Sequence, residues 1–347
     1  MNHRSSISNL QPQSSSLSSS SSFATSTIDN MDYYDDDDLD KMTKHFTKLC
    51  YVSSLSYLPI ETIPQSDYYK EHVPSLRPII QVVEPTTESG ATIFVDESEN
   101  DSTSIIVACR GSATIHNFAT NLQFQLVPMS DNIWSNGDDL MRRPKVHEGF
   151  QLASIGLWEQ LEPILTDIMK NNKKQYNEII FTGHSLGGGT AELCALQYAV
   201  NAVDGGGGGP ASASATTGLE ENMEVVTFAG PMIGDSNFAS YMNEKVSTLS
   251  SLLLSPNSNN DIYHVVHDKD PILSNNGPLW KQLGFVRSGV EISCDPYQPR
   301  LLFMTTTSSD SNDPTNDVGS RSKGFTIPPW NIVDHCKYLG LYVGPRL

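Results

Sequence analysis

Short apolar runs separated by turn residues recur along the chain and predict the strands of one sheet. The runs at 104–109 and 179–181 are continuously apolar, which is typical of strands covered on both faces. Two earlier runs, 78–83 and 91–95, flank a polar stretch, so we expect them to form neighbouring antiparallel strands. Further strands are expected at 223–228 and 262–266 and in a hairpin or sheet edge formed by 289–293 and 301–304.

Apolar residues at helical spacing predict helices between these strands. A long helix from 149 to about 169 would present one apolar face, made of Leu152, Ile155, Trp158, Leu161, Leu165 and Ile168. Another helix should cover 186–200, which is rich in Ala, Leu and Gln and lacks proline. An earlier helix would begin after the acidic run 35–38 and bury Met42, Phe46, Leu49 and Cys50. Strands alternating with helices predict an α/β fold with a mostly parallel central sheet.

The first part of the chain differs in composition from the rest. Serine dominates residues 1–28, which have no apolar pattern with which to form a core. We therefore predict a disordered Ser/Asp-rich leader at 1–38 and one domain at 39–347. Polar or glycine-rich stretches at about 203–221 and 305–324 read as flexible inserts within that domain.

A candidate catalytic motif lies where the strand at 179–181 meets the next helix. Gly183-His184-Ser185-Leu186-Gly187 has the Gly-x-Ser-x-Gly form of a nucleophile elbow, in which small glycines let strand and helix pass close to a strained serine. Ser185 is the candidate nucleophile. The backbone amide of Leu186, at the helix N-terminus, is a candidate donor to an oxyanion. We expect His184 to be a packed structural residue, because adjacent side chains at a sharp turn point apart.

A second candidate part of the oxyanion hole lies at the end of the strand 104–109, which runs into Arg110-Gly111-Ser112. A turn at this place can aim a backbone N–H and a hydroxyl at the elbow, so Ser112 is the second candidate for the oxyanion hole, against the alternative of an ordinary helix cap. After it, Ile115, Phe118 and Leu122 recur at helical spacing and predict a short amphipathic lid, against the alternative of a permanently packed helix.

A serine nucleophile needs a histidine base and a carboxylate to orient it, in the chain order Ser, acid, His for this fold type. His335 is the candidate base, because His264 lies within a predicted strand and His267 is too close to the candidate acids. Asp270 is favoured as the acid, with Asp268 as the alternative. A metal site made of His264, His267, Asp268 and Asp270 is disfavoured, since their side chains would diverge. We expect no metal and no cofactor.

Charge and cysteine content limit the partners. The formal net charge of −18 excludes nucleic acid as a natural partner, and no apolar run approaches the ~20 residues of a membrane-spanning helix. A lipid or ester substrate, met at a lipid–water interface, remains compatible. Five widely spaced cysteines indicate a reduced, cytoplasmic protein, with one bridge as the alternative. No secretory signal is evident, and the serine-rich, acid-poor leader leaves a plastid location open.

Several segments, in this order along the chain, resemble the class 3 or fungal-type lipases of the α/β-hydrolase fold. They cover about residues 40–345 and comprise Val107-Ala108-Cys109-Arg110-Gly111-Ser112, Val146-His147-Glu148-Gly149-Phe150, Phe181-Thr182-Gly183-His184-Ser185-Leu186-Gly187-Gly188, Thr227-Phe228-Ala229-Gly230-Pro231-Met232-Ile233-Gly234, His264-Val265-Val266-His267-Asp268-Lys269-Asp270 and Asp334-His335-Cys336-Lys337-Tyr338. The resemblance implies Ser185 as nucleophile, Asp270 as acid, His335 as base, and Ser112 with Leu186 as the oxyanion pair.

The function expected from this resemblance is a lipase, a serine carboxylic-ester hydrolase that acts on acylglycerols through an acyl-enzyme. A phospholipase A1 or galactolipase of the same fold, and a lipase-like signalling scaffold without turnover, are the alternatives. The sequence departs from the family pattern in three places. Ala229-Gly230 replaces a Gly followed by a small residue, Met232 replaces a basic residue, and Pro271 follows the acid directly, where the family usually has its proline three residues on. These departures concern substrate preference more than the triad.

Overall fold

The computed structural model describes residues 36–97, 103–111, 125–134, 142–171, 176–204, 222–252, 262–306 and 332–344. Most of the predicted leader and most of the two predicted inserts lie outside these ranges. The first helix, α1 (Asp36–Leu55), begins within the acidic run. Its first turn therefore carries acids, which interact favourably with the positive end of a helix dipole. The division into leader and domain stays a prediction.

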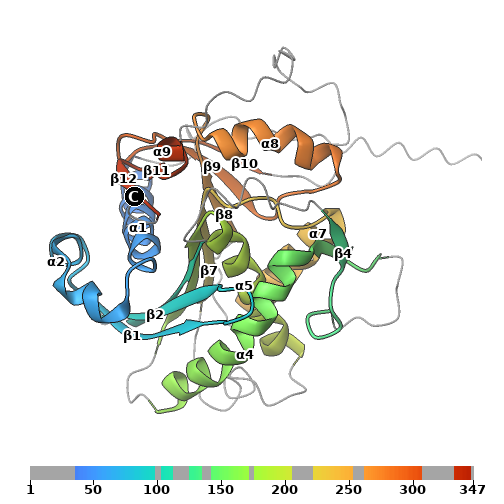
Figure 1. The fold of residues 1–347 in the computed structure, drawn as a ribbon, viewed down its shortest axis with the longest axis horizontal. Helices are drawn as coiled ribbons and strands as arrows, with labels where there is room; N and C mark the ends of the chain where they lie inside the picture. The colour runs from blue at the N-terminus through green and yellow to red at the C-terminus, as the bar shows by residue number, and fades with distance from the viewer. Residues whose placement is uncertain are drawn as a thin grey trace, which may run out of the picture.

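An eight-stranded sheet forms the centre of the molecule (Figure 1). Its spatial order is β1, β2, β3, β6, β7, β8, β9, β10. The strands are β1 (Leu76–Val83), β2 (Gly90–Glu97), β3 (Thr103–Arg110), β6 (Glu178–His184), β7 (Asn222–Phe228), β8 (Ile262–Val266), β9 (Val290–Cys294) and β10 (Leu301–Thr306). Pairing is parallel from β3 to β9 and antiparallel at both edges, as the apolar runs predict. The mostly parallel α/β sheet is thus confirmed.

Helices cover both faces of this sheet (Figure 1). One face carries α1, and the other carries α4 (Glu148–Asn171), α5 (Leu186–Asp204) and α7 (Ser236–Leu252). Alternate residues of each strand face opposite sides, so Ile105 and Phe181 join the core under α4 and α5, whereas Ile106 and Ile180 join the core under α1. Continuously apolar strands are therefore required here, because both faces of the sheet are buried.

Smaller elements surround the ends of the sheet. They are η2 (Ile60–Gln65), α2 (Asp67–His72), β4 (Leu126–Pro128), β5 (Lys145–His147), α8 (Pro271–Gln282), α9 (Ile332–His335), β11 (Lys337–Tyr338) and β12 (Leu341–Tyr342). The β11–β12 hairpin lies against α1, where Cys50 Sγ donates to Tyr338 O and Ser54 Oγ donates to Tyr342 O. The sequence pattern predicted none of the two-stranded pieces, because strands of two or three residues have no periodicity to detect.

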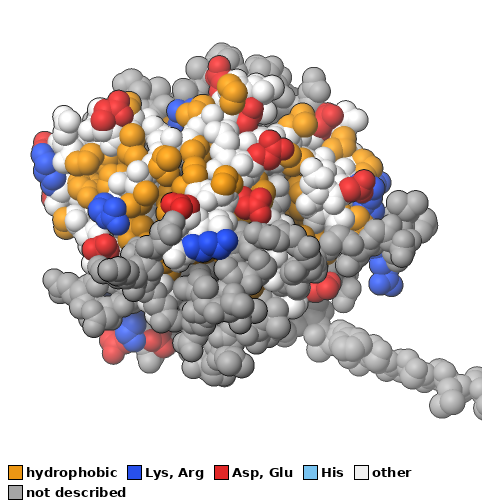
Figure 2. Space-filling view, turned by 90° about the horizontal axis from the view of Figure 1, so that it is seen from below, with side chains coloured by type: hydrophobic (Ala, Val, Ile, Leu, Met, Phe, Trp, Pro, Cys, Tyr) orange, Lys and Arg blue, Asp and Glu red, His pale blue; other side chains and the backbone are white. Residues whose placement is uncertain are grey.

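The surface seen from below carries hydrophobic side chains interspersed with charges of both signs (Figure 2). Large exposed apolar residues include Val83 of β1 and Leu152 of α4. Interspersed apolar side chains are ordinary on protein surfaces and mark no site by themselves. Within the described ranges, no helix is both long and apolar enough to cross a membrane.

Candidate active site

The elbow forms at the junction of β6 and α5, where the sequence predicts it. Ser185 has a φ of 57°, a left-handed conformation that is unfavourable for a residue with a side chain. Two backbone hydrogen bonds hold it there: Ser185 N donates to Phe228 O at 2.9 Å, and Gly188 N donates to Ser185 O at 2.9 Å. The elbow is therefore fixed by β7 on one side and by the first turn of α5 on the other.

Close backbone packing explains the two glycines of the motif. A Cβ on Gly187 would lie 2.2 Å from Cys109 O, and a Cβ on Gly183 would lie 2.5 Å from the backbone of Gly187. Neither approach is tolerable, so both positions require glycine. The same contacts place the C-terminal end of β3 directly against the elbow.

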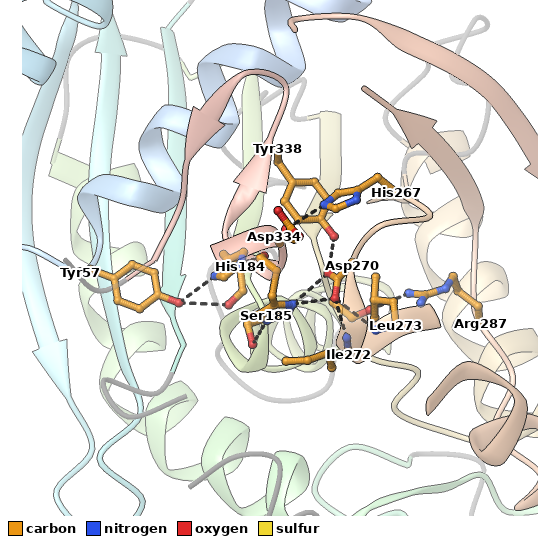
Figure 3. A network of polar contacts seen from close by, with 12 residues as sticks. Tyr57, His184, Ser185, His267, Asp270, Ile272, Leu273, Arg287, Asp334 and Tyr338 are labelled. Atoms are coloured by element: carbon orange, nitrogen blue, oxygen red, sulfur yellow. Dashed lines mark hydrogen bonds and ion pairs between the residues drawn. The ribbon is translucent and has the colours of Figure 1, made fainter. Parts of the chain in front are cut away.

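His335 hydrogen-bonds both Ser185 and Asp270, and Figure 3 labels these two partners. His335 Nε2 is 2.9 Å from Ser185 Oγ, and His335 Nδ1 is 2.8 Å from Asp270 Oδ2 and 3.0 Å from Oδ1. An ionised carboxylate only accepts hydrogen bonds, so Nδ1 carries the proton and Nε2 is free to accept one from the serine hydroxyl. His335 and Asp270 are fully buried and Ser185 is 4% exposed.

Asp270 owes its place to the start of α8. Its Oδ1 accepts hydrogen bonds from Ile272 N at 2.8 Å and Leu273 N at 3.2 Å, which makes it the N-cap, and Pro271 occupies the first helical position. Burial by itself would raise the pKa of this carboxyl, but His335, the Tyr338 hydroxyl and the Leu273 amide outweigh burial and lower it. Asp268, the alternative acid, is exposed and makes none of these contacts.

His335 differs in its setting from the expected loop. It is the last residue of α9, a helix of four residues, rather than part of an irregular segment. Its chain neighbour Tyr338 was not assigned a role from the sequence. The Tyr338 hydroxyl donates to Asp270 Oδ2 at 2.6 Å. The only sign of this role in the sequence is that Tyr338 lies three residues after His335. That spacing does not show that the Tyr338 hydroxyl reaches Asp270, which depends on the position of β11.

The oxyanion candidates are only partly within the described structure. Leu186 is the first residue of α5, whose first backbone N–H groups have no partner inside the helix. Ser112 and the lid candidates Ile115, Phe118 and Leu122 lie outside the described residues. Gly111 lies inside them, and a Cβ there would be 2.8 Å from His184 O, so the chain runs beside the elbow at position 111.

The other buried histidines make structural contacts. His184 Nε2 bonds His335 O at 3.0 Å and its Nδ1 bonds the Tyr57 hydroxyl at 3.1 Å, which agrees with the packed role expected for it. His264 bonds Thr227 Oγ1 and Ser288 Oγ. His267 bonds Asp334 O. Among the residues that the structure describes, no group of three or more His, Cys, Asp or Glu side chains could hold a metal ion.

The five cysteines, all of which lie in described segments, are free and buried. The alternative of one disulfide bridge does not hold in this structure. Burial raises the pKa of Cys336, next to His335, to about 11, so its thiol stays protonated and is no rival to Ser185 as a nucleophile.

Comparison with known proteins identifies the family. Residues 106–275 match the model of the family Lipase (class 3). A lipase of Rhizomucor miehei is 27% identical over 260 residues, which cover 74% of this chain and 57% of the relative. A phospholipase A1-II 4 of Oryza sativa subsp. japonica is 25% identical over 202 residues, which cover 55% of this chain and 43% of the relative. The chain thus spans about half the length of the curated relatives it matches.

Solved structures agree on the fold. The Rhizomucor miehei triacylglyceride lipase superposes with a TM-score of 0.60 at 22% identity, over 88% of this chain and 97% of that one. Lipase II from Rhizopus niveus superposes with a TM-score of 0.61 at 18% identity, over 88% and 97%. Residues 106–275 thus belong to the class 3, fungal-type lipase family, and the solved structures show that the chain has the α/β-hydrolase fold.

Proposed function

We propose that this protein is a serine carboxylic-ester hydrolase that cleaves acylglycerols, with Ser185 as nucleophile, His335 as general base and Asp270 as the orienting acid. The observation that carries the proposal is the 2.9 Å contact between His335 Nε2 and Ser185 Oγ, while both oxygens of Asp270 hold His335 Nδ1. That geometry lets the imidazole take the serine proton without moving.

The reaction follows from these positions. Ser185 Oγ attacks the ester carbonyl carbon while its proton passes to His335 Nε2. The developing oxyanion would be held by the amide of Leu186 and, as predicted from the sequence, by Ser112. Collapse of the tetrahedral intermediate releases the alcohol, which takes the proton from His335. Water then attacks the acyl-enzyme while its proton passes to His335 Nε2, and collapse of the second tetrahedral intermediate releases the fatty acid and returns that proton to Ser185 Oγ.

An apolar cluster beside the triad supports an uncharged acyl substrate. Ile272, Trp280, Phe285 and Cys336 form its buried part, and Leu186, Met232 and Leu273 pack against it. Leu186 follows the nucleophile, Ile272 and Leu273 follow the acid, and Cys336 follows the base. A hydrocarbon chain placed near Ser185 would therefore meet apolar side chains from all three segments of the triad, which favours acyl esters over polar ones.

Glycerophospholipids are the second candidate substrate, because the chain is also similar to a phospholipase A1 of rice. The two candidates differ in headgroup and share the acyl ester. A panel of triacylglycerol, phosphatidylcholine and galactolipid vesicles or emulsions, with fatty-acid release as the readout, separates them. We expect the highest rate on triacylglycerol, and a preference for the phospholipid or galactolipid would reassign the headgroup.

Labelling by a fluorophosphonate separates an enzyme from a scaffold that keeps the fold without turnover. We expect wild type to be labelled at Ser185 and Ser185→Ala to be unlabelled. An unlabelled wild type would contradict the proposal. The lid at Ile115, Phe118 and Leu122, action at a lipid–water interface, and a cytoplasmic rather than plastid location remain predictions from the sequence.

A further inference from the structure

The helix that carries His335 is held by two other histidines. His184 Nε2 is 3.0 Å from His335 O, and His267 Nε2 is 3.0 Å from Asp334 O (Figure 3). The two carbonyls are consecutive and belong to α9, whose C-terminal carbonyls have no partner within so short a helix. The two imidazoles therefore each hydrogen-bond the backbone of α9, at two consecutive residues.

Only one tautomer of each ring allows this arrangement. A carbonyl oxygen accepts and never donates, so each Nε2 must carry a proton. For His184 the opposite nitrogen is also assigned, because the Tyr57 hydroxyl donates to Nδ1 at 3.1 Å. Burial lowers the pKa of His184 to about 3 and also lowers the pKa of His267, so both rings stay neutral in the pH range where an esterase works.

The two histidines that hold α9 come from the segments that carry Ser185 and Asp270. His184 directly precedes Ser185, and His267 lies three residues before Asp270. Each histidine thus links the segment of one triad member to the backbone that carries the third. A helix of four residues has little stability of its own, so its position depends on such external contacts. His267 also packs against the ring of Tyr338, which in turn bonds Asp270.

We propose that His184 and His267 are positioning residues that set the distance of the His335 imidazole from Ser185 and Asp270 by clamping the backbone of α9 from both sides. Tyr57 supports the clamp by holding the tautomer of His184. The inference deepens the proposed function and rests on it. It assigns to two histidines, neither of which touches the Ser185 hydroxyl, a role in the geometry of the reaction.

Paired variants test the role of each donor. His184→Leu and His267→Leu remove the N–H, whereas His184→Gln and His267→Gln place an amide N–H near the former Nε2. We measure kcat and KM on a short soluble ester and the second-order rate of fluorophosphonate labelling. The leucine variants should lose about 10- to 100-fold in kcat and in labelling rate with KM little changed, because displacement of a reacting group by about 1 Å has effects of this size. The glutamine variants should recover most of that loss.

His264→Leu is the matched control. It removes another fully buried histidine of the same sheet, one that bonds Thr227 and Ser288 and not α9. It should lower the melting temperature and leave kcat of the folded protein near wild type. Equal losses in leucine and glutamine variants, wild-type labelling rates in folded leucine variants, or an equal loss of kcat in His264→Leu would overturn the inference.

Two further measurements keep the test decisive. If His184→Leu does not fold, Tyr57→Phe tests the His184 side of the clamp instead. We expect a loss of roughly two- to tenfold in kcat for one missing hydrogen bond. An unchanged rate would contradict the clamp. The downfield NMR proton of His335 Nδ1–H should broaden in the leucine variants and stay sharp in His264→Leu; the opposite would refute the clamp. A wild type that neither labels nor hydrolyses esters would contradict the proposed function, and the NMR signal would still decide the clamp.

Discussion

The Tyr338 hydroxyl and the His335 imidazole meet the same carboxylate oxygen, Asp270 Oδ2, at 2.6 Å and 2.8 Å. Tyr338 therefore supplies a second hydrogen-bond donor to the charged form of the carboxylate. Burial raises the pKa of Asp270. The interactions with His335 and, after them, the hydrogen bond from Tyr338 outweigh burial and lower it. Tyr338, three positions beyond the candidate base, thus helps to keep the candidate acid ionised.

Tyr338→Phe should raise the pKa of Asp270, because it removes a donor to the ionised form. Ester hydrolysis should then fall off at a higher pH on the acid side of the kcat/KM profile than in wild type, with a loss of up to about tenfold near neutrality for one hydrogen bond to a charged group. Tyr297→Phe, at an exposed tyrosine, is the control and should leave the profile in place. An acid limb that does not move in Tyr338→Phe would contradict this role.

Ser185→Ala and His335→Ala should each abolish ester hydrolysis, by roughly 10⁶-fold in kcat, because members of such a triad act as a unit. Asp270→Asn should cost less. Asp268→Asn is matched to it in chemistry and lies two residues away, but it changes an exposed side chain, so we expect kcat close to wild type. The measurement is steady-state hydrolysis of a soluble ester, and a larger loss in Asp268→Asn than in Asp270→Asn would show that the acid is assigned wrongly.

Ala229→Gly should stabilise the protein. Ala229 follows β7 with a φ of 54°, a conformation that costs an alanine about 1 kcal/mol or more and a glycine little. For a domain of this size about 1 kcal/mol corresponds to ~2 to 4 °C in melting temperature. Ala239→Gly, inside α7, should lower it by a similar amount, because glycine is unfavourable within a helix. Thermal unfolding of both variants checks the opposite signs, and a fall in Ala229→Gly would show that the lost methyl packing outweighs the relieved strain.

Glu192 in α5 should make stability depend on pH. Burial raises the pKa of this carboxyl from 4.5 to about 7, against smaller lowering effects of Ser288 and Arg287. Between these two pH values the folded chain keeps the proton that the unfolded chain loses. The contribution of Glu192 to the free energy of unfolding therefore decreases as the pH rises through that window.

Glu192→Gln removes this titration while keeping the shape of the side chain. Relative to wild type, the melting temperature of the variant should rise on going from pH 5 to pH 8. The difference between the two proteins at the two pH values is the quantity to measure, since other groups titrate equally in both. Glu244→Gln, at an exposed acid of α7, should show no such difference. A variant that tracks wild type at both pH values would mean that Glu192 is already ionised in the fold.

The elbow, the helices α1, α4 and α5, and the strands of the large sheet could be predicted from the sequence, because their signals are local, whereas α2, α7 and α8 were not predicted. Continuous apolar runs such as 104–109 and 179–181 report strands buried on two faces, and Gly-x-Ser-x-Gly reports its own steric requirement. The chain order of the candidate segments also favoured His335 as the candidate base. The lid, Ser112 and the extent of the leader were predicted in the same way and remain predictions.

The tertiary structure decided which side chains meet. Asp268 and Asp270 are alike in sequence, and only the N-cap of α8 turns one of them inward toward His335. The contacts of His184 with His335 O, His267 with Asp334 O, and Tyr57 with His184 join residues that lie 151, 67 and 127 positions apart. No periodicity encodes such pairs, because a side chain's partners across the chain depend on strand order and register. Those properties arise from packing the whole sheet between its two layers of helices.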